Sequence, residues 1–363
     1  MNTRPTVMEV NLTNLSYNIK QIQKYIGNKE LIPVIKANGY GSNINEYLPL
    51  IKPFKIVAVA TTDEGKYLRE LGYKNAILIL NQPSIQELDK ILKYNLIVGL
   101  SSNEFLDELI KRKSKIKVHL EIETGMYRTG ISLNNLSSYI EKLTKNKNIQ
   151  VEGIYTHLSS ADSDKYYTIN QLENFDKAIT IVQEKFKNIK YIHALASTGI
   201  INYLNYAKRT NAVRAGIILY GYYPCDSAMS KIFLKPILKL KTKITFLKEV
   251  PKNTPISYSK TYLTKKTTSI ATIPIGYADG LRRALSNKGF VIIKGKKCKI
   301  VGNICMDSCM VDVSSIKDVK VGDDVFIWDN ENIKVEDLAK ICKTINYEII
   351  STISKRVPRI YIS

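Results

Sequence analysis

A lysine at the end of an apolar run is the residue in this chain best placed to do chemistry. Lys36 follows Ile32-Pro33-Val34-Ile35 and precedes Ala37-Asn38-Gly39-Tyr40-Gly41. An amine at the end of a buried strand is partly desolvated, which lowers its pKa and makes it a usable nucleophile. Such a lysine forms a Schiff base with a carbonyl cofactor, and Tyr40 adds a hydroxyl suited to an anionic tail. A solvated lysine at a loop is the alternative, but the Asn-Gly-Tyr-Gly turn favours the reactive amine.

Later apolar runs also end in polar residues. Together with Lys36 these residues supply an imidazole, two arginines and hydroxyls, at Arg128, His157, Ser197 and Arg214. In a parallel barrel, residues at the ends of successive strands meet at one face. The set lacks the paired acids of a glycosidase.

Three of these residues have a structural alternative when taken singly. Ser197 and the amides of Gly216 and Ile217 are suited to a phosphate, because small residues let backbone donors approach an anion. Ser197 is equally suited to cap the next helix, Arg214 to pair with a carboxylate, and His157 to fill the core. Their recurrence at consecutive strand ends favours a site.

The elements that position them alternate in type. Apolar, β-branched runs recur, separated by amphipathic segments such as residues 15–22 and 85–92. The runs cover residues 31–36, 55–61, 75–80, 95–101, 116–123, 149–158, 188–197 and 211–220. Eight such strands with helical crossovers predict a closed (β/α)₈ barrel. An open doubly wound sheet is the rival, but no Gly-x-Gly-x-x-Gly turn follows the first strand.

The pattern changes near Phe233. Short, half-alternating runs broken by Pro, Gly and Asn predict a mainly antiparallel β domain, with one helix over residues 335–345 before a last strand. We therefore expect a barrel domain over residues 1–232 and a β domain over residues 233–363.

Composition excludes several classes of protein. No apolar run reaches the roughly 18 residues of a membrane span, and the N-terminus lacks the apolar core of a signal peptide, so we expect a cytoplasmic protein without a membrane partner. The net charge of +21 permits nucleic-acid binding, but the lysines are scattered and no DNA-binding motif accompanies them. A solvated, lysine-rich surface is the preferred interpretation.

The cysteines point to neither a disulfide framework nor a metal. They are five in number, at Cys225, Cys298, Cys305, Cys309 and Cys342. An odd count without a secretion signal argues against disulfides. A zinc pair at Cys305 and Cys309 is conceivable, but the chain has three histidines and no second cysteine pair. We expect free, buried thiols and no metal.

The chain as a whole resembles a known family. Its motifs, in order and almost from end to end, resemble those of the alanine racemases. They are Val34-Ile35-Lys36-Ala37-Asn38-Gly39-Tyr40-Gly41, Thr124-Gly125-Met126-Tyr127-Arg128, Thr156-His157, Ser197, Val213-Arg214-Ala215-Gly216, Ser257-Tyr258, Ile275-Gly276-Tyr277-Ala278-Asp279-Gly280, Ile304-Cys305-Met306-Asp307 and Arg356-Val357-Pro358-Arg359. The resemblance implies a barrel followed by a β domain, pyridoxal 5'-phosphate as cofactor, a small amino acid as substrate, and a homodimer whose active sites combine both chains.

The resemblance also implies roles for individual residues. Lys36 holds the cofactor and acts as one base, and Tyr258 of a second copy acts as the other from the opposite face of the substrate. His157 and Arg214 assist, and Arg214 faces the pyridine nitrogen, which a guanidinium leaves unprotonated. The remaining implied roles are phosphate binding by Tyr40, Ser197, Gly216 and Ile217, carboxylate binding by Arg128 and the Met306 amide, narrowing of the entrance by Tyr277, and support by Arg282 and Asp307.

Three departures from the family pattern affect these expectations. Glu121 stands where many relatives have a carbamylated lysine, and we hypothesise that its carboxylate orients Arg128 without carbon dioxide. Lys355 stands where some relatives have a phosphate-binding tyrosine, so it either pairs with the phosphate or points to solvent. Gly39 and Ser42-Asn43 replace an alanine and a His-Gly pair, which predicts a looser loop around Tyr40.

The leading prediction is a pyridoxal-phosphate racemase that interconverts L-alanine and D-alanine and supplies D-alanine for peptidoglycan. A racemase for serine, lysine or a broader set is the nearest alternative, because changes around Tyr127 and Tyr277 would reshape the pocket. A non-catalytic pyridoxal-phosphate carrier is the alternative from another class, although a carrier needs no second base at Tyr258.

Overall fold

The computed structural model describes residues 4–113, 115–225, 229 and 231–363. Contacts divide the chain into two compact units. The barrel unit comprises Ser16–Gly39 and Ile44–Lys235, and the sheet unit comprises Met1–Leu15, Tyr40–Asn43 and Pro236–Ser363. The expected boundary at residues 232–233 stays a prediction, and the contacts assign the N-terminal segment to the sheet unit.

The barrel unit is built on a parallel sheet. Within the described residues this sheet has eight strands in the order β2-β9-β8-β7-β6-β5-β4-β3. The strands are β2 (Glu30–Pro33), β3 (Ile56–Val59), β4 (Ala76–Ile79), β5 (Ile97–Leu100), β6 (Ile116–Glu121), β7 (Ile149–Tyr155), β8 (Tyr191–His193) and β9 (Ala212–Ala215). A parallel bridge between Val34 and Ala58 joins the two end strands. The predicted eight-stranded barrel is confirmed, as a nearly closed one.

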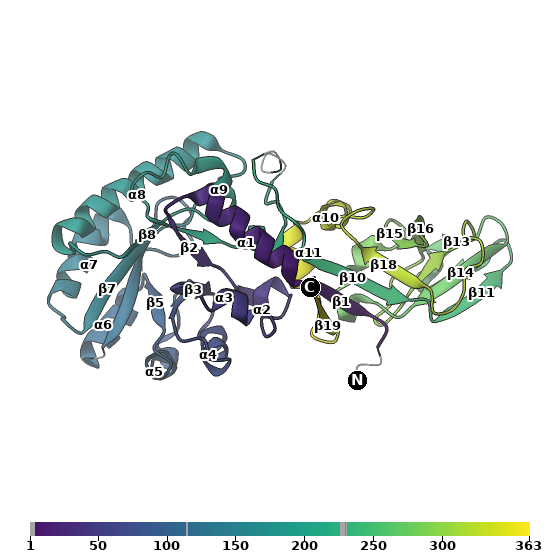
Figure 1. Cartoon of the computed structure of the whole chain (residues 1–363), viewed down its shortest axis with the longest axis horizontal. Coiled ribbons are helices and arrows are strands. Elements are labelled where there is room, and N and C mark those ends of the chain that lie inside the picture. The colour runs from purple at the N-terminus through teal and green to yellow at the C-terminus, as the bar shows by residue number, and fades with distance from the viewer. Residues whose placement is uncertain (1–3, 114, 226–228, 230) are drawn as a thin grey trace. The chain divides into compact units, whose positions relative to one another are not determined.

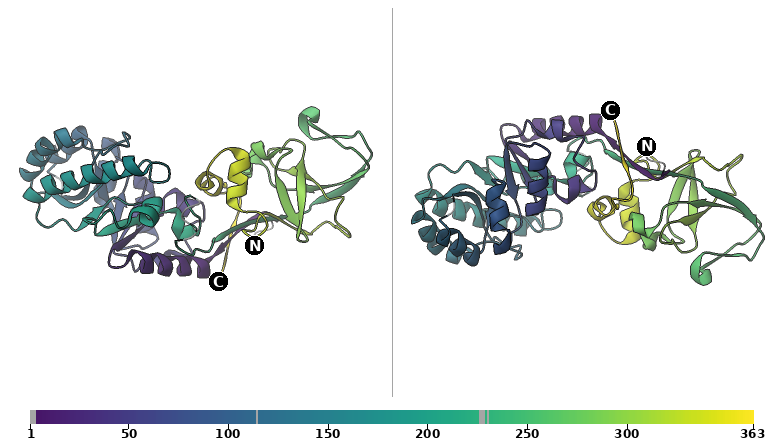
Figure 2. Two further views of the ribbon diagram at one scale, coloured as in Figure 1. Left: turned by 90° about the horizontal axis from the view of Figure 1, so that it is seen from above. Right: turned by 90° about the horizontal axis from the view of Figure 1, so that it is seen from below.

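Helices and 3₁₀ turns precede, connect and follow these strands. They are α1 (Leu12–Ile26), α2 (Lys36–Tyr40), α3 (Leu48–Ile51), α4 (Thr62–Glu70), η1 (Ile85–Glu87), α5 (Leu88–Lys93), α6 (Asn103–Lys111), α7 (Leu133–Thr144), α8 (Lys165–Lys185), α9 (Ser197–Tyr203) and η2 (Ile217–Tyr220). Helices α4 to α8 surround the strands in Figures 1 and 2. Helix α6 shows why such a segment folds there, because Ser102 caps it by accepting from the Phe105 amide at 3.1 Å and its apolar face is buried.

The strands are shorter than the apolar runs that predicted them. The run over residues 211–220 ends as a strand at Ala215 and continues as the 3₁₀ helix η2, and the run over residues 188–197 gives β8 and then helix α9. Burial continues past the last ladder hydrogen bond, so apolar character alone overestimates strand length. The shorter strands leave the polar residues in the loops at the carboxyl end of the barrel.

The sheet unit is mainly antiparallel, as predicted. The order of its large sheet, across the residues with described positions, is β11-β14-β17-β16-β15-β18-β10-β1-β19. These strands are β1 (Val7–Asn11), β10 (Leu238–Lys243), β11 (Phe246–Val250), β14 (Thr268–Ile273), β15 (Phe290–Ile293), β16 (Lys296–Val301), β17 (Cys309–Asp312), β18 (Asp324–Trp328) and β19 (Arg359–Ile362). Strands β12 (Pro255–Ile256) and β13 (Tyr262–Leu263) pair as a separate hairpin.

Two elements of the sheet unit were not predicted. Strand β1 precedes the first helix and pairs with β10 in antiparallel and β19 in parallel fashion. The helix expected over residues 335–345 ends at Cys342 as α10 (Val335–Cys342), because Lys343 adopts a left-handed conformation, and a second helix, α11 (Asn346–Ser351), follows. The N-terminal strand was not predicted because its partners lie more than 200 residues away in the sequence.

Two further expectations concern the membrane and the thiols. None of the helices formed by the described residues has the length and apolarity that a membrane crossing requires. All five cysteines are free thiols, but Cys298 and Cys309 alone are buried. Cys225, Cys305 and Cys342 are half-buried, so the expectation of burial is wrong for these three.

Candidate functional site

Lys36 begins a turn with an unusual backbone. It opens helix α2, in which Ala37, Asn38 and Gly39 all have positive φ, at 51°, 53° and 64°. A left-handed residue other than glycine or asparagine costs about 1–3 kcal/mol and persists where the surroundings enforce it, so Gly39 relieves strain that an alanine would add. Burial lowers the pKa of the Lys36 amine, the charges of Arg128 and Arg214 lower it further, and Glu64 opposes them. The sequence-based expectation of a desolvated amine agrees with this position.

Glu64 holds the backbone beside Lys36. One carboxylate oxygen accepts from the Ala37 amide at 2.5 Å, and the other accepts from Ala60 at 2.8 Å and Thr61 at 3.2 Å. The Thr61 side chain accepts in return from the Glu64 amide at 3.3 Å. The sequence analysis missed Glu64, although the spacing Thr61-x-x-Glu64 is a capping-box signal.

Arg214 is a buried arginine of the barrel unit that binds backbone carbonyls and histidine side chains. Its two Nη atoms donate five hydrogen bonds, to the carbonyls of Thr156, His193 and Ala194 and to the Nδ1 atoms of His157 and His193. Burial lowers the pKa of Arg214 to about 10, which still leaves it charged at neutral pH. The alternative of a carboxylate ion pair is not realised among the described residues, and Nε takes no part in the five bonds.

The guanidinium fixes the protons of three imidazoles. Because arginine only donates, the Nδ1 atoms of His157 (3.2 Å) and His193 (2.6 Å) must be acceptors. His193 therefore carries its proton on Nε2 and donates to Nδ1 of His119 at 2.9 Å. Burial, followed by the Arg214 charge, lowers the pKa of His119 and of His157 to about 3. His193 and His119 were not among the predicted site residues, although both lie inside predicted strands, over residues 188–197 and 116–123.

Ser197 and Gly216 are bonded to each other. The Ser197 hydroxyl accepts from the Gly216 amide at 3.1 Å and makes no cap bond to α9. The Gly216 amide thus has a protein acceptor, and its expected role in phosphate binding stays a prediction. The Ser197 proton is left to donate, and Ile217, the first residue of η2, presents an amide with no acceptor inside its own turn.

Arg128 lies on an ordered loop between β6 and α7. Glu123 shapes this loop by accepting from the backbone amides of Gly125, Met126 and Tyr127. Glu121, Glu123, Arg128, Thr156 and His157 are among the residues that line one small pocket. The loop therefore brings the predicted carboxylate-binding arginine to the pocket of the predicted imidazole.

Glu121 is buried but does not form an ion pair with Arg128 in the structure. One of its oxygens accepts from the Thr129 hydroxyl at 2.9 Å, and the other is buried without a hydrogen-bond partner among the described residues. Burial raises the pKa of Glu121, and the Thr129 hydrogen bond and the Arg128 charge oppose that rise. Any influence of Glu121 on Arg128 therefore acts through the neighbouring Thr129 and through space.

In the sheet unit, Tyr40 has an aromatic neighbour. The rings of Tyr40 and Tyr347 lie 6.2 Å apart between centroids and are tilted by 46°. Lys355 is exposed, with no hydrogen bond or ion pair described for it. Tyr347 was not predicted, because its partner lies 307 positions earlier in the chain and no local pattern marks the pair.

Tyr258 is fixed through its backbone and exposed at its ring. The Asn303 side chain donates to the Tyr258 carbonyl at 2.9 Å, and the Ser257 hydroxyl donates to the Asn303 carbonyl at 2.5 Å. Ser257 and Ser259 both have positive φ, at 66° and 62°. With 70% of its surface exposed, Tyr258 is presented to solvent by a rigid turn.

The loops of Tyr277 and Met306 are joined by backbone bonds. Tyr277 donates to the Cys305 carbonyl at 3.1 Å, and Ala278 donates to the Met306 carbonyl at 3.0 Å. A Cβ on Gly276 would lie 2.2 Å from the Met306 carbonyl oxygen, so this approach requires glycine. Tyr277 and Met306 are 43% and 53% exposed, on the same unit as the exposed Tyr258.

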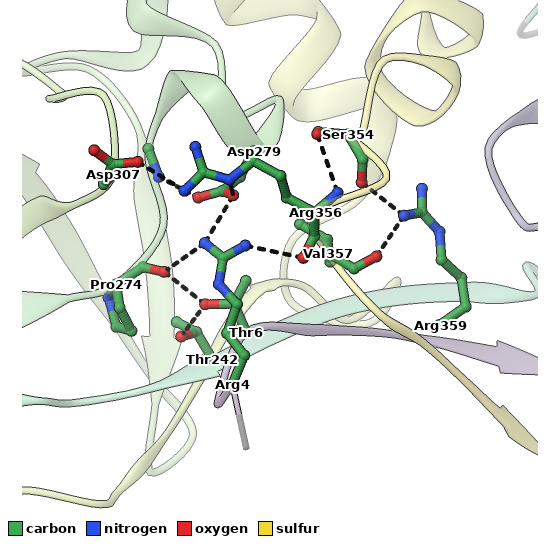
Figure 3. Close-up of polar contacts among 11 residues, drawn as sticks. Arg4, Thr6, Thr242, Pro274, Asp279, Asp307, Ser354, Arg356, Val357 and Arg359 are labelled. Atoms are coloured by element: carbon green, nitrogen blue, oxygen red, sulfur yellow. Dashed lines mark hydrogen bonds and ion pairs between the residues drawn. The ribbon is translucent and has the colours of Figure 1, made fainter. Parts of the chain in front are cut away.

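A network of charged residues in the sheet unit contacts these loops (Figure 3). Asp279 is fully buried and pairs with Arg4 at 2.7 Å, and Arg356 lies 3.5 Å from the same oxygen. Arg356 also bonds Asp307 at 2.7 Å. Asp307 therefore contacts a cluster formed by Arg4, Asp279 and Arg356, and the supporting role expected for it stays a prediction.

Arg282, the other predicted supporting residue, lies at the start of η6 (Arg283–Leu285). It pairs with Glu348 at 2.7 Å and donates to the Thr352 hydroxyl at 3.1 Å. These contacts anchor the loop after Tyr277 to α11, so Arg282 acts on the fold of the sheet unit.

Comparisons with known proteins cover the whole chain. Residues 10–224 match the family model described as "Alanine racemase, N-terminal domain", and residues 237–361 match "Alanine racemase, C-terminal domain". An alanine racemase of Halothermothrix orenii is 38% identical, over 99% of this chain and 97% of its own length. The solved alanine racemase of Clostridium difficile 630 is 36% identical with a TM-score of 0.93, covering 100% and 97% of the two chains. Another solved structure of that protein, in complex with cycloserine, gives a TM-score of 0.91 at 34% identity and covers 100% and 96%.

Proposed function

The chain belongs to the alanine racemase family, and from this we propose that it interconverts L-alanine and D-alanine with pyridoxal 5'-phosphate as cofactor. The observation that carries the proposal is the half-buried amine of Lys36, with its pKa lowered by burial and by Arg128 and Arg214, at a strand end of the barrel. Such an amine is more readily deprotonated, and therefore more nucleophilic, than an exposed lysine.

The donors around Lys36 fit the cofactor chemically. Arg214 has Nε free of its five bonds to protein acceptors, which suits an unprotonated ring nitrogen. The Ser197 hydroxyl and the Ile217 amide suit a phosphate. When bound, the cofactor supplies an aldehyde for the amines and an electron-withdrawing ring that acidifies the hydrogen on Cα.

We propose a different phosphate set from the one that the sequence implied. The Tyr347 phenol beside Tyr40 supports a pair of tyrosines at the phosphate, and the exposed position of Lys355 supports its pointing to solvent. Within the barrel unit, the Ser197 hydroxyl and the Ile217 amide are the phosphate donors that the sequence implied, and Gly216 positions the Ser197 hydroxyl. A Tyr347→Phe variant that holds the cofactor as tightly as the parent chain would contradict this assignment.

The protein's own part in the reaction is to remove a proton from one face of Cα and to add a different proton from the opposite face. Lys36 acts on one face of the substrate, and Tyr258 from a second copy of the chain acts on the other. Arg128 and the Met306 amide hold the substrate carboxylate. His157 keeps its Nδ1 as an acceptor from Arg214 and its proton on Nε2, so it is a neutral hydrogen-bond partner for a base.

Deuterium exchange in D₂O tests the function directly. We expect deuterium at Cα of both enantiomers when either L-alanine or D-alanine is supplied. Tyr258→Phe should retain exchange from one enantiomer only, because one face keeps its base. A panel with L-serine and L-lysine decides between an alanine racemase and a broader enzyme, and a chain that binds the cofactor but exchanges no Cα hydrogen would be a carrier.

A further inference from the structure

The barrel is closed at the strand that ends in Lys36. Strands β2 and β3 are the two ends of the eight-stranded order. They are joined by the bridge between Val34 and Ala58 and by a hydrogen bond from the Ile35 amide to the Ala58 carbonyl at 2.9 Å. Ladders of two to six registered pairs join most of the other neighbours. The amine of the proposed reaction therefore stands at a thinly bonded seam.

The Glu64 side chain crosses this seam. One oxygen accepts from the Ala37 amide, directly after β2, at 2.5 Å. The other accepts from Ala60 at 2.8 Å and from Thr61 at 3.2 Å, directly after β3. One carboxylate thus binds the backbone on both sides of the seam through charge-assisted hydrogen bonds, which are stronger than neutral ones.

Helix capping explains the contacts on the β3 side of the seam only. Thr61 and Glu64 form a capping box at the start of α4, and capping needs only the bonds on the β3 side. Glu87 forms a comparable cap at the start of η1, where it accepts from the Ser84 amide at 2.9 Å. No bond from Glu87 to a second strand is described. The bond to Ala37 is extra, and Ala37 is the first of the left-handed residues after Lys36.

We propose that Glu64 is a positioning residue for Lys36, whose carboxylate holds the left-handed turn across the β2–β3 seam and so fixes the reactive amine. The inference rests on the proposed function only for the chemistry of Lys36. The strained turn needs an external restraint, and Glu64 supplies one at its first amide. Its negative charge also raises the pKa of Lys36 against the effect of burial.

Hydrogen exchange of the full-length chain tests the restraint. Glu64→Gln keeps the side-chain length but leaves one acceptor oxygen and no charge, so it cannot serve both strands. We expect exchange of peptides covering residues 36–41 or 58–62 to become about tenfold faster or more, with and without added pyridoxal 5'-phosphate. Glu87→Gln is the matched control and should leave both regions unchanged. Unchanged exchange in Glu64→Gln would overturn the inference.

The reactivity of Lys36 provides a second readout that a purely structural role would not change. The rate of Lys36 acetylation, followed by peptide mass spectrometry against pH in the cofactor-free chain, gives the pKa of the amine. Loss of the Glu64 charge should move this midpoint to lower pH in Glu64→Gln. Glu64→Asp keeps the charge but not the reach, so it should lie nearer the parent chain in midpoint and nearer Glu64→Gln in exchange.

These outcomes separate the inference from the proposed function. A Glu64→Gln chain with the parent midpoint contradicts the inference whatever its activity. If the parent chain fails to racemise alanine but the exchange and midpoint changes are seen, the proposed function fails and the positioning of Lys36 by Glu64 stands. If Glu64→Gln does not fold, Glu64→Asp carries the exchange test alone, and parent-like exchange in that variant overturns the inference.

Discussion

Arg214 illustrates how single residues define the chemistry of this barrel. It is 2% exposed and has no carboxylate in an ion pair among the described residues. Its charge is instead held by three carbonyl oxygens and two neutral imidazoles. Hydrogen bonds of this kind satisfy a buried cation without neutralising it. A lysine at this position would have three donors rather than five and would leave acceptors unpaired.

At the same scale, Glu121 tests how the substrate carboxylate is held. Its carboxyl is buried, and its charge interacts with that of Arg128. Glu121→Gln preserves an acceptor for Thr129 and removes only the charge. We expect KM for alanine to rise about tenfold with kcat much less affected, because about 1.4 kcal/mol of orientation of Arg128 is lost. Steady-state kinetics of the variant measure this split.

A variant with the opposite charge at residue 121 is the control for this prediction. Glu121→Lys places a cation near Arg128 and should weaken substrate binding more than Glu121→Gln does. A Glu121→Lys enzyme with the parent KM, assayed in buffers freed of carbon dioxide, would contradict the role of the carboxylate.

Loop pairing is the decisive feature at the scale of elements. The backbone bonds between the Tyr277 loop and the Met306 loop bring two predicted site residues together that are 29 positions apart in the sequence. Gly276 permits this approach, and the buried Asp279 fixes it through the Gly276 amide at 3.1 Å and through Arg4 at 2.7 Å. The positions of the two site residues therefore depend on a contact that neither makes with its own side chain.

Gly276→Ala should separate the two loops. The new methyl group would lie 2.2 Å from the Met306 carbonyl oxygen, so the backbone must shift. We expect a loss of about 1–3 kcal/mol in the free energy of unfolding of the sheet unit and a raised KM for alanine. Urea unfolding followed by the fluorescence of the single tryptophan, Trp328, reports on this unit.

The control for this variant is a glycine in open space. Gly295 has a positive φ of 74° and no heavy atom within 4 Å of a built Cβ, and asparagine tolerates that conformation. Gly295→Asn should therefore leave the unfolding free energy within about 0.5 kcal/mol of the parent. Equal unfolding curves for Gly276→Ala and the parent chain would show that the loops are free to move apart.

The elements themselves were predicted with mixed success, for physical reasons. Seven crossovers and eight strands follow from hydrophobic period, which is a local property. The N-terminal strand β1 and the short helix α11 escaped because each is stabilised by segments distant in sequence. Glu64 carried a local signal that was overlooked, whereas the contact of Tyr40 with Tyr347 has no local signal.

At the scale of the whole molecule, acid sensitivity is concentrated in one unit. All three histidines of the chain lie in the barrel unit, and burial lowers the pKa of each of them. The unfolded chain therefore binds more protons than the folded one as pH falls below the ordinary histidine pKa. The stability that these neutral histidines contribute is fully present above about pH 6.5. Below that pH, the free energy of unfolding decreases by about 1.4 kcal/mol per pH unit for each histidine.

His119→Asn checks this sign. His119 is fully buried with a pKa of about 3, so it should account for about 2 kcal/mol of the stability lost between pH 7 and pH 5. Removing it should reduce that loss when barrel unfolding is followed by circular dichroism in urea. The Trp328 signal of the histidine-free sheet unit is an internal control. If the free energy of barrel unfolding in the variant depends on pH as steeply as in the parent chain, the prediction is contradicted.

The proposed homodimer makes its own prediction at this scale. Tyr258, Tyr277 and Met306 are exposed on the sheet unit, which suits a contribution to another copy. Lys36→Ala and Tyr258→Phe chains, each inactive alone, should recover up to about a quarter of the parent activity when mixed equally, because half of the dimers are mixed and each has one intact site. Mass spectrometry under native conditions confirms subunit exchange, and exchange without recovery would rule out shared sites.

The sequence by itself determined the eight-stranded barrel, the antiparallel second domain and the family, and it predicted Lys36 as the reactive amine, because hydrophobic period and contiguous motifs are local properties of the chain. Tertiary structure alone decided the left-handed turn beside Lys36, the neutral tautomers of His157 and His193 that Arg214 fixes, the pairing of Tyr40 with Tyr347, and the engagement of the Gly216 amide by Ser197. Each of these depends on atoms from distant segments meeting within hydrogen-bond or van der Waals distance. Such meetings are set by how the strands close into a barrel and the loops pack on a sheet, and no single stretch of sequence specifies them.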